Sequence, residues 1–272
     1  TDRGDEAQIY DVTMDISGRH VVVTGAAGGI GAALARRFHA AGAKLVLADR
    51  LPPDAVAAGL AGSLAIAADL GTEAGNIALI RAAEEAFGPI DLFFANAGVA
   101  LGTDPMDDEE MWDLSFAINT HAHRWAARHL LPGWLARGEG YFCSTASAAG
   151  LLAQIGSAPY SLSKHAAVAF AEWLAITYGA RGLKVSCLCP QGVNTAMLAQ
   201  SSTIGDGGEV VRSVGAVLEP DDVAEVVHQA IVDERFLILP HPEVADYLRF
   251  KATEPEKWIA GMQRLQRRVM GV

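Results

Sequence analysis

The chain has 272 residues, of which 51% are hydrophobic and 19% are charged. This balance excludes an intrinsically disordered protein and suits one α/β domain with a large core. The formal net charge is −11 without any basic run, so a phosphate backbone would repel the chain and nucleic acid is not an expected partner.

Residues 1–15 are polar and acidic, the reverse of a secretory signal, and we expect a loose N-terminal arm there, followed by a single domain over 16–272. No apolar stretch reaches the roughly 18 residues that span a bilayer, so we expect no membrane span. The three cysteines, Cys143, Cys187 and Cys189, are few and odd in number. This argues against a disulfide framework and for a reducing compartment, and we therefore expect a cytoplasmic protein.

Short apolar runs alternate with segments of helical period along the chain. The predicted strands cover residues 20–24, 44–48, 63–68, 90–95, 140–145, 183–189 and 235–239. The predicted helices cover residues 29–41, 73–87, 106–118, 122–136, 158–179 and 220–232, and we expect Asp221 or Asp222 to cap the last of them. This alternation predicts a single-domain α/β Rossmann fold, in which a seven-stranded parallel sheet carries helices on both faces.

Two segments near the C-terminus fall outside this alternation. Residues 196–215 are rich in glycine and other small residues, and we expect them to form a substrate lid with little internal order. Residues 243–270 are predicted to form an amphipathic helical tail, with Trp258, Met262 and Leu265 at helical spacing. This tail could pack on its own subunit, cover a pocket or join a partner subunit.

A glycine-rich turn, Thr24-Gly-Ala-Ala-Gly-Gly-Ile-Gly31, joins the first predicted strand to the first predicted helix. Glycines allow the backbone to approach a pyrophosphate closely, and a helix N-terminus attracts negative charge. An ordinary helix-entry loop and the nucleotide loop of a methyltransferase are the alternatives, but the position between strand and helix favours a dinucleotide. The residues expected to contact it here are Gly25, Gly28, Gly29, Ile30 and Gly31.

Asp49 ends the second predicted strand, where a carboxylate can accept hydrogen bonds from the adenosine ribose and repel a 2′-phosphate. Arg50 follows and could instead bind that phosphate. Against this, Gly28 occupies the position before Gly29, where a basic residue would help to hold a phosphate. We therefore expect NAD as the cofactor, with NADP as the alternative, and both Asp49 and Arg50 beside it.

Tyr160 and Lys164 are four residues apart and so share one face of a predicted helix. A tyrosine ordinarily has a pKa near 10, and acid–base chemistry near neutrality needs a lower pKa, which the Lys164 ammonium would favour. Ser147 lies in the turn after the fifth predicted strand, where its hydroxyl could orient a substrate oxygen. Because this Tyr–Lys spacing is common by chance, an exposed surface pair is the alternative.

In their order and spacing these motifs resemble the short-chain dehydrogenase/reductase family over roughly residues 16–240. Further segments that match the family are Asp69-Leu70, Ala95-Asn-Ala-Gly98, Asn119 and Pro190-Gln-Gly-Val-Asn-Thr195. By this resemblance, the remaining cofactor contacts are expected at Asp69, Leu70, Asn96, Ala97, Gly98, Tyr160, Lys164, Pro190, Gly192, Val193 and Thr195.

The resemblance also implies a mechanism of hydride transfer between NAD and an alcohol or ketone. Tyr160 as a phenolate takes the hydroxyl proton, and Lys164 lowers the pKa of that phenol and binds the nicotinamide ribose. Ser147 stabilises the substrate oxygen, and Asn119 holds a water chain that returns the proton to solvent. No metal is expected in this scheme.

Two residues depart from the family pattern. Gln191 replaces the usual Gly and could alter the turn over the nicotinamide, and Ala95 replaces an Asn, which would affect packing at the strand end. The C-terminal tail also differs from the usual ending, so the common tetramer is not implied. Self-association is still the default expectation, and we predict a homo-oligomer, either a dimer or a tetramer.

The substrate pocket is expected at the carboxyl edge of the sheet. Its predicted walls are mostly apolar, which favours a medium-sized apolar secondary alcohol or its ketone. A non-catalytic dinucleotide-binding protein and an NADP-dependent carbonyl reductase are the competing hypotheses. The predicted wall residues are Val99, Leu151, Leu152, Gln154, Ile155 and Met197.

Overall fold

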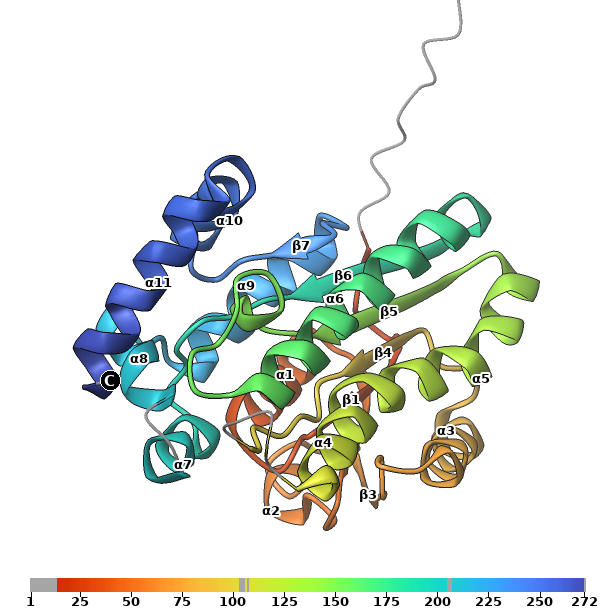
Figure 1. The fold of residues 1–272 in the computed structure, drawn as a ribbon. Coiled ribbons are helices and arrows are strands. Elements are labelled where there is room, and N and C mark those ends of the chain that lie inside the picture. The colour runs from red at the N-terminus through yellow and green to blue at the C-terminus, as the bar shows by residue number, and fades with distance from the viewer. Residues whose placement is uncertain (1–13, 103–105, 107, 205–206, 272) are drawn as a thin grey trace, which may run out of the picture.

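The computed structural model describes residues 14–102, 106, 108–204 and 207–271, and its centre is a seven-stranded sheet (Figure 1). The strands are β1 His20–Thr24, β2 Lys44–Asp49, β3 Leu64–Ala67, β4 Leu92–Ala95, β5 Gly140–Thr145, β6 Leu183–Leu188 and β7 Leu237–Ile238. They lie in the order β3-β2-β1-β4-β5-β6-β7, and all neighbours are parallel. The order changes direction between β1 and β4, which is where sheets of this kind bind ligands.

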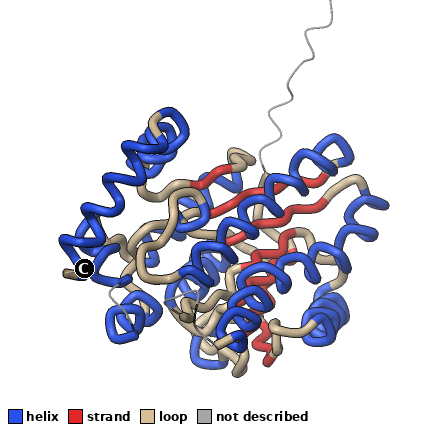
Figure 2. Tube along the Cα trace, in the orientation of Figure 1, coloured by secondary structure: helices blue, strands red, loops and turns tan. Residues whose placement is uncertain are grey.

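Helices cover both faces of the sheet, as Figure 2 shows. They are α1 Gly29–Ala40, α2 Asp54–Ala57, α3 Glu73–Phe87, α4 Glu109–Phe116, α5 Ala122–Arg137, α6 Ala158–Tyr178, α7 Ala196–Ile204, α8 Gly207–Val214, α9 Pro220–Val232, α10 Glu243–Thr253 and α11 Pro255–Met270. Side chains of α1 and α9 share one core with Val21 and Val23 of β1. Val22 points to the other face, into a core with α3, α5 and α6.

The predicted α/β fold is confirmed, and so are most of its elements. The strands predicted over 20–24 and 140–145 and the helices predicted over 73–87 and 220–232 have the expected bounds. These strands are buried along their whole length, and the apolar residues at their centres were a reliable signal. The strand predicted over 235–239 is shorter and covers only Leu237–Ile238.

The cap of α9 differs from the prediction. Its N-cap residue is Glu219, while Asp221 and Asp222 lie in the first turn, because Pro220 occupies the first helical position. Proline suits that position, since the N–H group it lacks would have had no partner within the helix. The two aspartates therefore complement the helix dipole without capping the helix.

The segment 196–215 is more ordered than predicted. It contains the helices α7 and α8, although it was expected to have little internal order. Glu209, Val210 and Arg212 belong to α8, and Val210 is buried. Packing of such apolar side chains outweighs the low helix propensity of the glycines in this segment.

The C-terminal tail is helical, as predicted, but it is broken in two. α10 ends at Thr253, and α11 begins at Pro255, since the proline can start a helix and cannot continue one. Of the predicted N-terminal arm, all but Met14 and Asp15 lies outside the described residues. Within the described residues we find no helix with the length and apolar character needed to cross a membrane.

A short π-helix, η1 (Ala117–His121), joins α4 to α5. The sequence predicted two separate helices over 106–118 and 122–136, and it did not predict this wider turn. Segments of this kind are frequent at functional sites. η1 contains Asn119, one of the predicted catalytic residues.

Candidate active site

The glycine-rich turn after β1 leaves no room for a side chain at Gly25 or at Gly31. A Cβ on Gly31 would overlap the carbonyl oxygen of Gly25, and a Cβ on Gly25, whose φ is +65°, would lie 2.9 Å from the Cα of Ala97. Helix α1 then begins at Gly29, and its N-cap residue, Gly28, has no side chain with which to cap it. The first N–H groups of α1 are therefore left for an external acceptor such as a pyrophosphate.

Asn96 ties together the ends of β1, β4 and β5. Its Nδ2 donates to the carbonyl oxygen of Thr24 at 3.0 Å, and its Oδ1 accepts from the hydroxyl of Thr145 at 3.0 Å. The Thr24 Oγ1 accepts from the N–H groups of Asn96 and Ala97 at 2.9 and 3.0 Å. The predicted cofactor segment 96–98 is therefore held against the glycine-rich turn.

The carboxylate of Asp49 lies beside the same turn. Its Oδ2 accepts from the N–H of Ala27 at 3.0 Å, and its Oδ1 accepts from the N–H of Arg50 at 2.7 Å. The Arg50 side chain is exposed. After β3, Asp69 is exposed and Leu70 is buried in the core. Asp49 is thus the predicted acidic residue that the structure brings to the turn.

Tyr160 and Lys164 lie one turn apart on α6 and face each other. The Lys164 Nζ is 5.7 Å from the centre of the Tyr160 ring and donates to the carbonyl oxygen of Thr145 at 2.9 Å. Lys164 is buried, and this burial lowers the pKa of its ammonium to about 8. The cause is the loss of water around the charged form. The alternative of an exposed surface pair is therefore wrong.

Burial raises the pKa of the Tyr160 phenol above its ordinary value, and a hydrogen bond with Ser147 opposes the rise. The sequence predicts that Lys164 lowers the pKa of Tyr160. In the structure of the chain alone, however, this pKa is raised. The desolvation of the phenol outweighs the other effects, and the ammonium is engaged by the carbonyl of Thr145. In the chain alone, Tyr160 therefore holds its proton at neutral pH.

Ser147 stands between Tyr160 and the segment after β6. It caps the short 3-10 helix η2 (Ala148–Gly150), where its Oγ accepts from the N–H of Ala149 at 3.1 Å. The hydroxyl also lies 3.5 Å from the carbonyl oxygen of Pro190. These contacts fix the serine hydroxyl next to the phenol, as its predicted role requires.

Asn119 is fully buried and holds the loop after β4. Its Oδ1 accepts from the N–H of Val99 at 2.9 Å, and its Nδ2 donates to the carbonyl of Val99 at 2.9 Å and to Ser163 Oγ at 3.0 Å. A Cβ on Gly98 would lie 3.2 Å from Lys164 Nζ and 3.3 Å from Asn119 Oδ1. Asn119 and Lys164 therefore approach the same point of the chain.

The predicted cofactor segment 190–195 leaves β6 and returns to the glycine-rich turn. Val193 pairs with Leu218 in an isolated parallel bridge. The Thr195 side chain lies beside α1, since a Cβ on Gly29 would be 3.1 Å from its Cγ2. The segment therefore closes one side of the space in front of α1.

A contact that the sequence did not predict fixes Gln191 in this segment. Its N–H donates to Nδ1 of the buried His241 at 3.1 Å, and the other ring nitrogen, Nε2, lies 3.2 Å from the carbonyl oxygen of Ala216. Since Nδ1 accepts, the proton of the neutral imidazole lies on Nε2. His241 is 50 residues from Gln191 along the chain, and no local pattern marks it.

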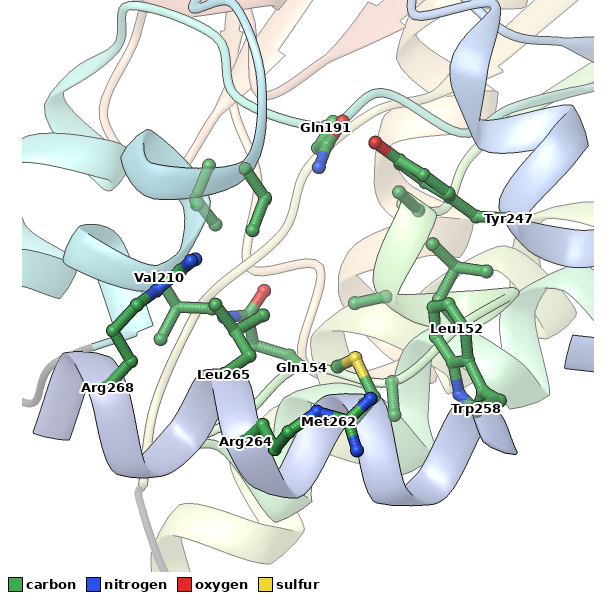
Figure 3. Close-up of a pocket in the computed structure, with 16 residues that line it drawn as sticks. Leu152, Gln154, Gln191, Val210, Tyr247, Trp258, Met262, Arg264, Leu265 and Arg268 are labelled. Carbon is green, nitrogen blue, oxygen red and sulfur yellow. The ribbon is translucent and has the colours of Figure 1, made fainter. Parts of the chain in front are cut away.

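A cavity of about 500 Å³ lies next to Ser147, between η2, Gln191, α8 and α11 (Figure 3). Among the predicted walls it contains Leu152 and Gln154. The tail contributes Trp258 and further residues of α11, so the tail covers a pocket of its own chain. The full lining is Ala148, Ala149, Leu152, Ala153, Gln154, Gln191, Val210, Val211, Val214, Tyr247, Trp258, Gly261, Met262, Arg264, Leu265 and Arg268.

Four predicted wall residues lie outside this lining. Val99 is bonded through its backbone to Asn119, and the carbonyl of Leu151 accepts from Lys251 Nζ at 2.7 Å. The carbonyl of Ile155 accepts from the side chain of Gln154, and Met197 on α7 is 37% exposed. Their contact with a substrate stays a prediction.

Comparison with known proteins gives a consistent result. The model of the short chain dehydrogenase family matches residues 19–204. The 1-deoxy-11-beta-hydroxypentalenate dehydrogenase of Streptomyces exfoliatus is 36% identical over 252 residues, which cover 87% of this chain and 88% of that protein. The human epidermal retinol dehydrogenase 2 is 29% identical over 238 residues, covering 83% of this chain and 75% of that protein.

Solved structures share the fold. A short chain dehydrogenase/reductase from Burkholderia phymatum, crystallised in complex with NAD, superposes with a TM-score of 0.79 at 30% identity, covering 89% of this chain and 96% of that one. Levodione reductase superposes with a TM-score of 0.75 at 26% identity, covering 82% of this chain and 96% of that one.

Proposed function

Because the chain belongs to the short-chain dehydrogenase/reductase family, we propose that it transfers a hydride between NAD(H) and a secondary alcohol or its ketone. The observation that carries the proposal is the meeting of Ser147, Tyr160 and Lys164 beside a cavity. Ser147 is close enough to Tyr160 to oppose the rise in the pKa of its phenol, and Lys164 lies against the same ring. A hydroxyl, a phenol and an ammonium in this arrangement can bind a substrate oxygen and move its proton.

The residues at the switch point of the sheet fit a dinucleotide. Side chains at Gly25 or Gly31 would collide with backbone, so the turn presents bare N–H groups to a pyrophosphate. The carboxylate of Asp49 beside this turn can accept hydrogen bonds from ribose hydroxyls and would repel a 2′-phosphate. NAD is therefore the proposed cofactor, and a comparison of kcat/KM for NAD and NADP tests the choice.

In alcohol oxidation, Tyr160 accepts the hydroxyl proton at its phenolic oxygen, and in ketone reduction it donates that proton. Ser147 holds the substrate oxygen beside the phenol. The Lys164 ammonium, 5.7 Å from the ring centre, favours the phenolate but does not by itself bring the pKa of Tyr160 below its ordinary value. A dinucleotide held by the glycine-rich turn and Asp49 would supply the hydride acceptor, and in its oxidised form a positive charge that favours the phenolate. Asn119 fixes the loop at Val99 beside Lys164 and supports the path by which the proton reaches water.

The proposed substrate has a largely apolar body of medium size. A cavity of about 500 Å³ lies in the range of small-molecule sites, and Leu152, Met262 and Leu265 give it a mainly apolar wall. The names of two relatives point the same way, since one is a hydroxypentalenate dehydrogenase and the other a retinol dehydrogenase.

The test is a panel of alicyclic and aromatic secondary alcohols, followed through the absorbance of the NADH formed. Tyr160→Phe removes the proton acceptor, and we expect turnover to fall at least about a hundredfold, as for the loss of a general acid–base group. Fluorescence titration with NADH should show nearly unchanged affinity. NADH binding without turnover of any alcohol by the native chain would instead indicate a non-catalytic dinucleotide-binding protein.

A further inference from the structure

The wall of the cavity formed by α11 carries two arginines. Arg264 and Arg268 lie one turn apart on this helix, and both line the cavity (Figure 3). Within the part of the chain that the structure describes, neither forms an ion pair. Arg249 on α10, by contrast, pairs with Asp246 at 2.6 Å. The chain has a formal net charge of −11 and is therefore rich in acidic residues. Even so, among the described residues no acidic side chain pairs with either arginine that faces the cavity.

The rest of the lining gives these charges no counterpart. Apolar side chains such as Leu152, Val210 and Val214 form most of it, and no aspartate or glutamate is among the lining residues that the structure describes. A guanidinium group presents a planar fork of N–H donors that matches a carboxylate. One side of a mainly apolar cavity is therefore suited to an anion.

The end of the cavity next to Ser147 lies away from the two arginines. Ala148 follows Ser147 directly, and it lines the cavity together with Gln191. In Figure 3, Gln191 lies across the cavity from α11. A ligand whose hydroxyl or carbonyl reaches Ser147 would therefore direct its opposite end toward Arg264 and Arg268.

We propose that Arg264 and Arg268 form an anion subsite, and that the substrate is an apolar alcohol or ketone with a carboxylate remote from its reacting carbon. This inference rests on the proposed function and narrows its substrate class. Both arginines are exposed to water, so screening limits the effect. We expect about a tenfold preference for an acid over a neutral molecule of the same shape, weakening as salt is added.

The test measures binding without turnover, using the full chain loaded with NADH. Decanoate and decan-1-ol share one apolar chain, and their dissociation constants are compared by calorimetry at low salt. The native chain should bind decanoate about tenfold more tightly. In Arg264→Gln/Arg268→Gln the preference should vanish while decan-1-ol binds as before, which also reports that the cavity is intact. Each single variant should lose part of the preference.

Arg267→Gln is the matched control for either single variant, because Arg267 lies on the same helix and does not line the cavity, and its loss changes the net charge by the same single unit. Its preference for decanoate should stay at the native value. Equal binding of the two probes by the native chain, or an equal loss in Arg267→Gln, overturns the subsite. Failure of the proposed function would appear differently, as NADH binding without oxidation of any alcohol.

Discussion

At the residue scale, Lys164 imposes a cost on folding that depends on pH. Burial lowers the pKa of this ammonium from 10.5 to about 8 in the folded chain. For a base whose pKa is depressed by folding, the cost is fully present below the folded pKa. It is relieved as pH rises from about 8 toward 10.5, because there the unfolded chain binds more protons. The full cost is on the order of 3 kcal/mol.

Lys164→Met should therefore change the pH dependence of stability. Relative to the native chain, the free energy of unfolding of the variant should be higher at pH 7 and should lose this advantage by about pH 10. Loss of the hydrogen bond to Thr145 adds an offset that does not vary with pH. Urea unfolding of both proteins at pH 7, 8.5 and 10 measures the difference. A difference that is constant across this range would show that the ammonium is well solvated.

The residues of the candidate site were predictable where one element sets their geometry. Tyr160 and Lys164 needed only a helix to come together, and Ser147 needed only the end of a strand. The raised pKa of Tyr160 was not predictable, because it depends on burial by distant parts of the chain. The contact between Gln191 and His241 was not predictable either, because the two residues are 50 positions apart along the chain.

At the scale of elements, the turn between β1 and α1 depends on the absence of one Cβ. In Gly31→Ala the new methyl group would collide with the carbonyl oxygen of Gly25, so the turn must open or shift. We expect a loss of about 2 kcal/mol or more, as for overpacking of a tight contact, and at least a tenfold weaker binding of NADH. Thermal unfolding and fluorescence titration measure the two effects.

Gly28→Ala supplies the comparison for stability. A Cβ there would meet nothing within 4 Å, and its φ of −172° is open to any residue. Its melting temperature should match that of the native chain. If Gly31→Ala were equally stable and bound NADH normally, the close approach of Gly31 to Gly25 would have no role in holding the cofactor.

Elements buried on both sides could be predicted from the sequence with nearly correct bounds. β1 and β5 have apolar centres, Val21 to Val23 and Tyr141 to Cys143, and are buried along their whole length. The helices α7 and α8 were not predicted. Small and polar residues weaken the helical signal of α7, and two glycines begin α8, where the burial of Val210 depends on other parts of the chain. The π-helix η1 has no sequence period of its own, so the sequence did not reveal it.

At the scale of the whole molecule, one face of α6 is apolar and open to solvent. Trp173 and Ile176 are 51% and 78% exposed, and Leu162, three turns earlier on the same face, is 51% exposed. The neighbouring helix α4 adds Met111 and Leu114, which are 41% and 42% exposed. Clusters of exposed apolar side chains mark association surfaces, and we propose that a second copy of the chain covers this face in a symmetric homo-oligomer.

Light scattering should then give the mass of two or more chains, and Ile176→Glu should lower it toward that of one. A two-fold interface brings the same residue close from both copies, so the substitution places two buried charges together. In one isolated chain the side chain at position 176 is largely in water, so the melting temperature of the variant at low concentration should change little.

Ile259→Glu, at a site 55% exposed on α11, introduces the same charge away from α6 and should leave the mass unchanged. A native chain that scatters as a monomer at all concentrations would contradict the oligomer, and an equal effect of both substitutions would place the interface elsewhere.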